Sequence, residues 1–489
     1  MAILKSFRSI LNGLFKKQKN PACFAPFNNM TIEKSGKVTV CCYNRSLVLG
    51  KYPDESLNNI WFGNTRKLLI EQFLIDRAPS SCYHCLTNCL STDSPESKIF
   101  CSRAWNLSRF SDYPVQIEFI LDNICNLDCI MCSQFCSTSS TNEVALDVEK
   151  VDYDHRFLKE LEPFLKSGNF FVFSGGEPFL IPVYKEIWKY IHKENPKAKI
   201  YVQTNGTILT EEIKHIIETY KMEISVSIDS VEKNTYEQIR RNASFEKTFH
   251  NLEYFLNYAE TYKKTITLRI TPSKINAYEI PEVLTYCNSK NMLLGLGIIE
   301  SPCYLAIWSL PSSELEIIIN NYRFIYIDDK TDNPVIRRNN IIFSSYVNLV
   351  NKYYDKKKYN EQNKEIILSN MIKAREDIEK NFITNLSHNI QEIDCSTDLK
   401  KKFLDDVDVF INENYKKYSG LFDDNRLFYS YFFSFNETTD LRPFLFNGLN
   451  ITDAIVAERM KELAYLFSTN TFDRITNVKN YDCKTCAET

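Results

Sequence analysis

Three cysteines lie close together in the segment LDNICNLDCIMC. Cys125, Cys129 and Cys132 have the spacing C-x3-C-x2-C. Thiolates are the usual protein ligands of iron–sulfur clusters, and protein thiolates normally hold all four irons of a cubane cluster. Three thiolates on one loop would hold three irons and leave the fourth open, as catalytic metal sites do and structural sites do not. A zinc knuckle and chance clustering are the alternatives that the spacing leaves open.

A second group of cysteines lies near the N-terminus. Cys23 and Cys41 flank a glycine in the pattern C-x12-G-x4-C, and Cys82 and Cys85 follow as C-x2-C. A hairpin that turns at Gly36 would bring Cys23 and Cys41 together. The four thiolates would satisfy one cubane cluster or one tetrahedral zinc ion. Cys89 is an alternative fourth ligand of this site. A further cluster could be held by Cys89, Cys101, Cys483 and Cys486.

The sequence predicts that these cysteines lie in a reducing compartment. Residues 1–20 contain no continuous apolar stretch of signal-peptide length, and no later run is long enough to span a bilayer, so the sequence predicts a cytoplasmic protein. Clustered cysteines there usually bind metal. The apolar side chains of residues 1–20 share one helical side, which favours docking on the protein's own surface; a membrane-surface or partner helix is the alternative. The net charge of −3 indicates no nucleic-acid partner.

The elements that must position the three-cysteine loop alternate between strands and helices. Strands are expected at 115–121, 169–174, 199–204, 222–228, 265–270 and 292–299. Amphipathic helices are expected between them, at 155–165, 183–193, 211–220, 245–260 and 280–289. Parallel strands need such crossover helices, so the pattern predicts an α/β fold with a partial (β/α)6 TIM-like barrel. The predicted domains are an N-terminal basic segment, a cysteine-rich module, the barrel and a mostly helical C-terminal extension, at 1–20, 21–105, 106–305 and 306–489.

Motifs at successive strand ends resemble those of the radical S-adenosylmethionine (SAM) superfamily over about residues 115–300. After the cysteine loop come SGGEP, TNGT and SVSIDS, and then the segment RRNASFEKTFHNL. The resemblance implies that Cys125, Cys129 and Cys132 hold a SAM-binding [4Fe–4S] cluster. The other implied cofactor-binding residues are Met131, Gly175, Gly176, Glu177, Pro178, Asn205, Ser227 and Asp229.

The implied roles of these residues agree with their chemistry. Met131, where the family usually has an aromatic residue, is apolar enough to lie against adenine. The glycines of SGGEP would let the backbone approach a ligand closely, and Glu177 would accept a hydrogen bond from the methionine ammonium. Ser227 and Asp229 would face the ribose hydroxyls. A turn at SGGEP and a helix cap at SVSIDS are the structural alternatives. Arg269, in the fifth expected strand, is open to a ligand carboxylate or to an ion pair.

The N-terminal cysteines resemble the Twitch and SPASM auxiliary-cluster modules. Such modules generally follow the barrel, whereas this one precedes it. The resemblance implies a second [4Fe–4S] cluster on Cys23, Cys41, Cys82 and Cys85, with zinc as the alternative. It also implies an enzyme that takes electrons from a donor such as flavodoxin or ferredoxin and generates a 5′-deoxyadenosyl radical. The substrate is either a sugar or other small metabolite, or a ribosomal peptide. A non-catalytic metal-binding scaffold is the rival function.

Overall fold

The computed structural model describes residues 23–41, 47–74, 82, 112–132, 151–299, 305–325, 330–363, 396–402 and 404–405. The chain divides into two compact units, one of residues 1–140 and 147–353, and one of residues 141–146 and 354–489. The described cysteines of both groups belong to the first unit. The boundaries expected for the four domains stay predictions.

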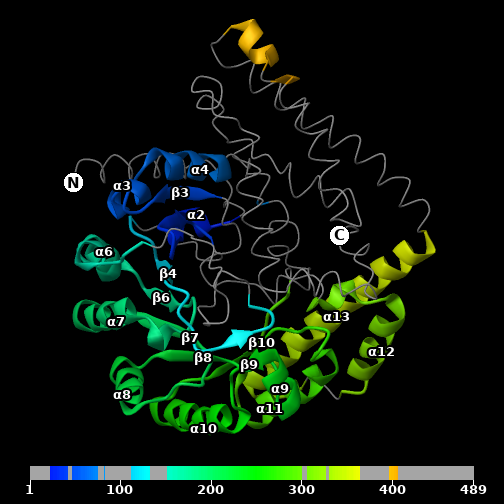
Figure 1. Cartoon of the computed structure of the whole chain (residues 1–489). Coiled ribbons are helices and arrows are strands. Elements are labelled where there is room, and N and C mark those ends of the chain that lie inside the picture. The colour runs from blue at the N-terminus through cyan, green and yellow to red at the C-terminus, as the bar shows by residue number, and fades with distance from the viewer. Residues whose placement is uncertain are drawn as a thin grey trace. The chain divides into compact units, whose positions relative to one another are not determined.

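Nine strands form one sheet in the order β11-β10-β8-β7-β6-β4-β1-β2-β3 (Figure 1). The six strands expected from the sequence are present and pair in parallel: β4 (Gln116–Ile120), β6 (Phe170–Phe173), β7 (Lys199–Thr204), β8 (Glu223–Ser227), β10 (Thr267–Ile270) and β11 (Leu293–Leu296). The partial barrel is therefore confirmed.

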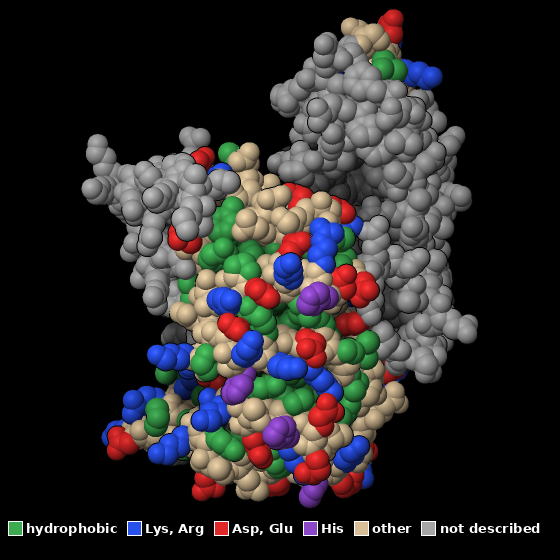
Figure 2. Space-filling view, turned by 90° about the vertical axis from the view of Figure 1, so that its left-hand side faces the viewer, with side chains coloured by type: hydrophobic (Ala, Val, Ile, Leu, Met, Phe, Trp, Pro, Cys, Tyr) green, Lys and Arg blue, Asp and Glu red, His purple; other side chains and the backbone are tan. Residues whose placement is uncertain are grey.

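Helices cover the outside of the curved sheet (Figure 1): α6 (His155–Ser167), α7 (Pro182–Glu194), α8 (Glu211–Tyr220), α9 (Lys233–Ile239), α10 (Phe245–Tyr262) and α11 (Ile280–Ser289). Short polar side chains cap the N-termini of three of these helices. Asp154, Thr210 and Ser244 accept hydrogen bonds from backbone N–H groups in the first turns of α6, α8 and α10. Charges of both signs alternate on the surface around α6 to α8, where Lys185 pairs with Glu212 (Figure 2). That face does not present the basic patch that nucleic acid would need.

The N-terminal module continues the barrel sheet. It contains α2 (Ala25–Asn28), β1 (Asn29–Glu33), β2 (Lys37–Thr39), β3 (Val48–Lys51), α3 (Leu57–Trp61) and α4 (Asn64–Leu74). β1 and β2 form the expected hairpin, and Gly36 in its turn has φ +82°, which favours glycine. The parallel pairing of β1 with β4 was not expected from the sequence. It makes the module part of the same sheet.

A buried arginine holds the beginning of this module together. Arg66 on α4 is 1% exposed, and its guanidinium carbon lies 3.5 Å from the centre of the Trp61 ring. Its nitrogens donate to the carbonyl oxygens of Pro26, Phe27 and Trp61. Arginine can satisfy several acceptors at once with its planar fork. Arg66 thus fixes the turn that directly follows Cys23.

Helices follow the last barrel strand: a 3-10 turn, η7 (Ile307–Ser309), then α12 (Ser312–Arg323) and α13 (Pro334–Gln362). Asn339 of α13 ties this part to β11, since its side chain accepts from the Leu294 N–H at 2.7 Å and donates to the Met292 carbonyl at 2.8 Å. The predicted helical character is confirmed for these elements, and residues 364–395 of the predicted extension lie outside the described residues. Within the described chain, no helix combines the length and apolar character that a membrane span requires.

Candidate metal centre

The three-cysteine loop is fastened to the segment that follows α9. Asp128 and Cys129 form β5, which pairs antiparallel with β9 (Arg240–Arg241). The Ile130 N–H donates to the Ile239 carbonyl at 3.0 Å, and the Cys132 N–H donates to the Cys129 carbonyl at 3.0 Å. The loop therefore has a fixed backbone path at the carboxyl end of β4. Active-site loops of barrel folds lie at this edge.

Nitrogen donors point at two of the three sulfurs. The Leu127 N–H lies 3.5 Å from Cys125 Sγ, and the Asn205 side-chain amide lies 3.8 Å from the same atom. Arg240 Nη1 lies 3.9 Å from Cys129 Sγ. Such donors stabilise negative charge on sulfur, and hydrogen bonds to sulfur tune the potentials of iron–sulfur clusters.

The protonation of the thiols reflects their burial. Burial raises the pKa of Cys129 to about 11, while the Arg240 guanidinium opposes that rise. Burial also raises the pKa of Cys125, and the N–H bonds from Leu127 and Asn205 oppose it. Metal binding must therefore displace protons from these thiols. The donor set, three soft thiols on one loop with N–H groups directed at two of them, fits an iron–sulfur cluster.

Zinc stays the alternative metal for the cysteine loop. A zinc ion would draw its thiolates to about 2.3 Å from one centre, whereas a cubane cluster would bind each thiolate through a different iron.

The two glycines of SGGEP contact the cysteine loop. The Gly176 N–H donates to the Asp122 carbonyl at 3.0 Å, and the Glu177 N–H donates to the Ile124 carbonyl at 2.7 Å. A Cβ atom on Gly176 would lie 2.0 Å from the Ile124 oxygen, and one on Gly175 would lie 2.5 Å from the Asp122 oxygen. These glycines were expected to let the backbone approach a ligand closely, and that role stays a prediction. In the structure, the space beside them is filled by the backbone leading to Cys125.

Glu177 is fully buried at the junction of two strand ends. Its Oε1 accepts from Thr204 Oγ1 at 2.8 Å and from the Phe179 N–H at 3.3 Å, and its Oε2 accepts from the Asn205 N–H at 2.8 Å. The carboxylate thus caps the 3-10 turn η4 (Pro178–Leu180), which begins at Pro178. A carboxylate has about four acceptor positions, and these hydrogen bonds use three of them. Burial raises the pKa of Glu177 to about 7, against the effect of these three hydrogen bonds.

Asp229 and Arg240 form a buried ion pair that the sequence analysis did not anticipate. Asp229 Oδ2 lies 2.6 Å from Arg240 Nη2, and the two side chains are 0% and 9% exposed. Asp229 Oδ1 accepts from the Thr271 N–H at 2.6 Å. Burial raises the pKa of Asp229, and Arg240 opposes that rise. Asp229 was expected to face a ribose; here its oxygens contact protein groups, and that ribose role stays a prediction.

The other predicted ligand residues lie around this pair and the loop. Asn205 is 8% exposed and joins the loop through Asn126 Oδ1 at 2.9 Å as well as through Cys125. Ser227 is 9% exposed at the end of β8. Met131 is partly buried against a small cluster of Ile299, Leu305 and Ala306. Arg240 was noted in the sequence only as the first residue of the segment RRNASFEKTFHNL. Its contacts with Asp229 and Cys129 depend on the fold and could not be predicted from that segment.

The N-terminal cysteines lie toward the amino end of β4, whereas the cysteine loop follows its carboxyl end. Cys41 lies two residues beyond Thr39, just after β2. Thr39 is in register with Thr31 of β1, and Thr31 is in register with Glu118 of β4. About 13 Å of strand then separates the level of Cys41 from the end of β4, at roughly 3.3 Å per residue. Cys23 is buried, and burial raises its pKa to about 12, with smaller contributions from Cys41 and Cys82. The hairpin therefore brings these thiols near one another, as expected.

Several predicted features lie outside the described residues. They are the helix at 1–20 and the cysteines Cys85, Cys89, Cys101, Cys483 and Cys486. The fourth ligand of the N-terminal site is therefore still a prediction.

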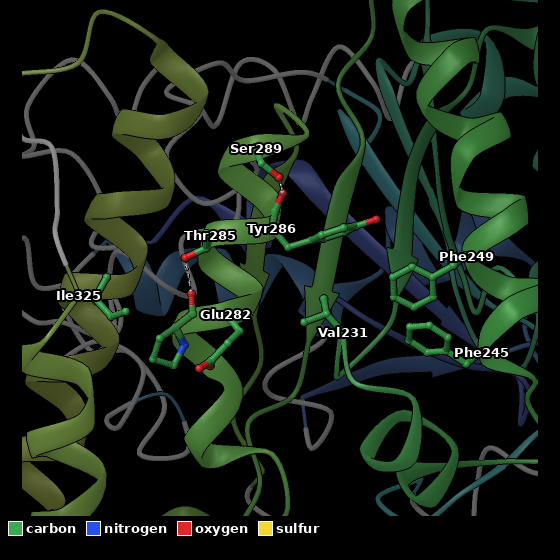
Figure 3. Close-up of a pocket in the computed structure, with 9 residues that line it drawn as sticks. Val231, Phe245, Phe249, Glu282, Thr285, Tyr286, Ser289 and Ile325 are labelled. Atoms are coloured by element: carbon green, nitrogen blue, oxygen red, sulfur yellow. Dashed lines mark hydrogen bonds between the residues drawn. The ribbon is translucent and has the colours of Figure 1, made fainter.

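A surface pocket of about 600 Å³ lies among the helices on the outside of the barrel (Figure 3). Phe245 and Phe249 of α10 stack on one side with ring centres 4.0 Å apart, and Glu282, Thr285 and Tyr286 of α11 lie opposite. None of the predicted ligand residues lines it. The pocket is therefore separate from the cysteine loop.

Comparisons with known proteins agree with both cysteine sites. Residues 119–273 match the Radical SAM superfamily, and residues 23–86 match SPASM, an iron–sulfur cluster-binding domain. The antilisterial bacteriocin subtilosin biosynthesis protein AlbA of Bacillus subtilis is 30% identical over 139 residues, which are 28% of this chain and 29% of AlbA. The probable GTP 3′,8-cyclase of Methanocella arvoryzae is 27% identical over 181 residues, which are 37% of this chain and 55% of that protein.

Solved structures with similar folds were also found. Native anSMEcpe with bound AdoMet has a TM-score of 0.34 at 19% identity and covers 44% of this chain and 60% of its own. Streptococcus suis SuiB bound to the precursor peptide SuiA has a TM-score of 0.33 at 15% identity and covers 44% of this chain and 46% of its own. The chain thus spans only part of each of these relatives.

Proposed function

From the premise that residues 119–273 belong to the radical SAM superfamily and residues 23–86 to the SPASM domain, we propose that this chain cleaves SAM and modifies a substrate by radical chemistry. The observation that carries the proposal is the cysteine loop, with nitrogen donors directed at Cys125 and Cys129. When bound there, a [4Fe–4S] cluster supplies the electron that converts SAM to methionine and a 5′-deoxyadenosyl radical, which removes hydrogen from the substrate.

The chain's own residues would hold and orient the cofactor. Cys125, Cys129 and Cys132 would ligate three irons and leave one for SAM. Glu177 would accept a hydrogen bond from the methionine ammonium at its remaining acceptor position, since its other positions are used by Thr204, Phe179 and Asn205. Met131 would lie against the adenine, and Ser227 would lie near the ribose.

Arg240 would contribute positive charge beside the cluster. It contacts Cys129 Sγ and is held by Asp229, so its guanidinium cannot turn away without breaking a buried ion pair. A positive group near the sulfurs stabilises the more negative, reduced cluster. We therefore assign Asp229 the role of positioning Arg240.

A peptide is the first candidate substrate class, because AlbA takes part in the biosynthesis of a bacteriocin. A small metabolite is the second, since another relative is named a probable GTP 3′,8-cyclase. The N-terminal site would hold a second [4Fe–4S] cluster on Cys23, Cys41, Cys82 and Cys85. Electrons would come from a donor such as flavodoxin or ferredoxin.

Release of 5′-deoxyadenosine tests the proposal. Anaerobically reconstituted protein with a strong reductant should release it from SAM, and Cys129→Ala should abolish that release. Cys287→Ala is the matched control, because Cys287 is a buried thiol on α11, outside the cysteine loop. Undiminished release by Cys129→Ala would refute the assignment. A brown, iron-loaded protein that never cleaves SAM would favour the scaffold function.

A further inference from the structure

Arg269 projects from the middle of β10 toward the side of the sheet away from the helices. Its neighbours Leu268 and Ile270 are 0% exposed and belong to the buried face that packs under the helices. Side chains alternate along a strand, so Arg269 belongs to the opposite, inner face of the barrel. It is in register with Ser227 of β8 and with Gly295 of β11. Arg269 is therefore level with Ser227 at the end of β8, one residue before the end of β10.

The guanidinium of Arg269 has no protein partner in the described part of the chain. Its Nε is buried without a hydrogen-bond acceptor. No carboxylate of the described residues lies within 4.0 Å of it, whereas Arg240 has Asp229 at 2.6 Å. A buried donor without an acceptor destabilises the folded protein, and more strongly when it is charged. Such a group is expected where a ligand supplies the acceptor.

The surroundings of Arg269 suit an oxyanion. Ser227 is the neighbour in register, and its hydroxyl is assigned to the SAM ribose. Ser225 lies one pair further down β8, and its buried Oγ also has no hydrogen-bond partner. Gly295, on the other side of Arg269, adds no side chain to the space. A guanidinium fork with a hydroxyl beside it recognises carboxylate and phosphate oxygens.

We propose that Arg269 and Ser225 form a binding subsite for an oxyanion, carboxylate or phosphate, carried by the substrate. This inference rests on the proposed radical SAM function and specifies the class of its substrate. SAM also carries a carboxylate, but its methionine end is assigned to Glu177 beyond β6. Three strand spacings separate β6 from β10, which is about 14 Å along the sheet. The carboxylate of SAM lies next to its ammonium, so the anion at Arg269 belongs to the substrate.

Arginine labelling with phenylglyoxal tests the subsite on the full chain. The rate of labelling at each arginine is measured by peptide mass mapping, without and with glutarate, inorganic phosphate or SAM as probes. Arg269 should be labelled faster than Arg240, which serves as the internal control because it is buried and paired. Glutarate or phosphate should slow the labelling of Arg269 in a saturable way, and SAM should not. Ser225→Ala should weaken that protection while Arg269 stays reactive.

Binding of SAM to reconstituted Arg269→Gln and Arg269→Lys provides the second measurement. Both variants should bind SAM as the wild-type protein does. Protection of Arg269 by SAM, or weaker SAM binding by Arg269→Gln, would assign this arginine to the cofactor and overturn the proposal. Equal labelling rates at Arg269 and Arg240, or no protection by either anion, would also overturn it. The labelling needs no SAM cleavage, so a failure of the proposed function would be seen separately.

Discussion

The two cysteine sites are built in opposite ways. In the cysteine loop, the thiols are close neighbours in sequence, and the groups that orient them come from distant strand ends: Asn205 after β7 and Arg240 after α9. In the N-terminal module, Cys23, Cys41 and Cys82 come from separate segments, and a local hairpin brings the first two together. The first site therefore depends on the barrel for its surroundings, and the second depends on the module's own fold for its ligand set.

The largest expected effect separates the irons of the two sites. If each site holds its own cubane, intact protein carries about eight irons per chain. Changing Cys125, Cys129 and Cys132 together to Ala should leave about four, in a protein whose colour no longer responds to SAM. Changing Cys82 and Cys85 to Ala should remove about four and leave SAM binding unaffected. Iron and zinc are measured on the same samples.

The metal counts also identify the alternatives. About four irons with roughly one zinc in the intact protein would make the N-terminal module a structural zinc site. Substantially more than about eight irons would require a further cluster on cysteines such as Cys483 and Cys486. Loss of all iron after either set of changes would contradict the independence of the two sites.

A pair of glycines gives a smaller and more local test of the same comparison. Gly176→Ala would place a Cβ 2.0 Å from the Ile124 oxygen, and Gly36→Ala would place one 1.8 Å from the Tyr52 oxygen. Overpacking of this kind costs about 1–3 kcal/mol or more. The first variant should lose SAM binding and the irons of the cysteine loop, and the second should lose the irons of the N-terminal module. Iron analysis and SAM titration distinguish the two results.

The control for both variants is Gly297→Ala, whose Cβ would lie 3.3 Å from Thr271 Oγ1 and would demand only a small shift. It should keep both iron sites. If Gly176→Ala disturbed only the module, the cysteine loop would not be supported by SGGEP in the way that the backbone contacts indicate.

The smallest expected effect concerns Glu177. Burial raises its pKa to about 7, so the folded protein binds this proton more tightly than the unfolded chain does. The stability from the neutral carboxyl group is complete below the ordinary carboxyl pKa and is lost as pH rises through about 7. Melting temperature should therefore fall less between about pH 5 and pH 8 in Glu177→Gln than in wild type. Equal slopes in the two proteins would refute the raised pKa.

The same variant tests the ligand role of Glu177. Loss of a charge-assisted hydrogen bond worth about 1.5–3 kcal/mol should weaken SAM binding by one to two decades at normal iron content. Wild-type affinity should itself decline as pH falls below about 7, where Glu177 becomes neutral. Thr210→Ala, which removes the N-cap of α8 on the barrel surface, is a control that should leave SAM affinity unchanged. Equal affinity of Glu177→Gln and wild type would leave Glu177 as a cap of η4 only.

Sequence reasoning found the elements whose signals are local. The six barrel strands have continuous apolar runs, and the helices between them have regular amphipathic spacing, so both were predicted at nearly their observed bounds. The turn at Gly36 was predicted from the cysteine spacing around it. The cysteine loop was identified in the same way, because its three thiols are adjacent in the chain.

The features that were missed depend on pairing between distant residues. The pairing of β1 with β4 joins segments more than eighty residues apart, and nothing in either strand specifies its partner. The contact of Arg240 with Asp229 and Cys129 arises only when β9 is laid against β5. The tight packing of Gly176 on Ile124 likewise depends on how two loops run beside each other.

The pairing of β1 with β4 also bears on how the chain can be divided for experiments. All five residues of β4 pair with β1, and the first four of them also pair with β6. A shortened protein that began near residue 112 would turn β4 into an edge strand with unpaired N–H and C=O groups. Such edges recruit other chains and promote aggregation. The barrel should therefore be expressed with its N-terminal module attached, even when only the cysteine loop is of interest.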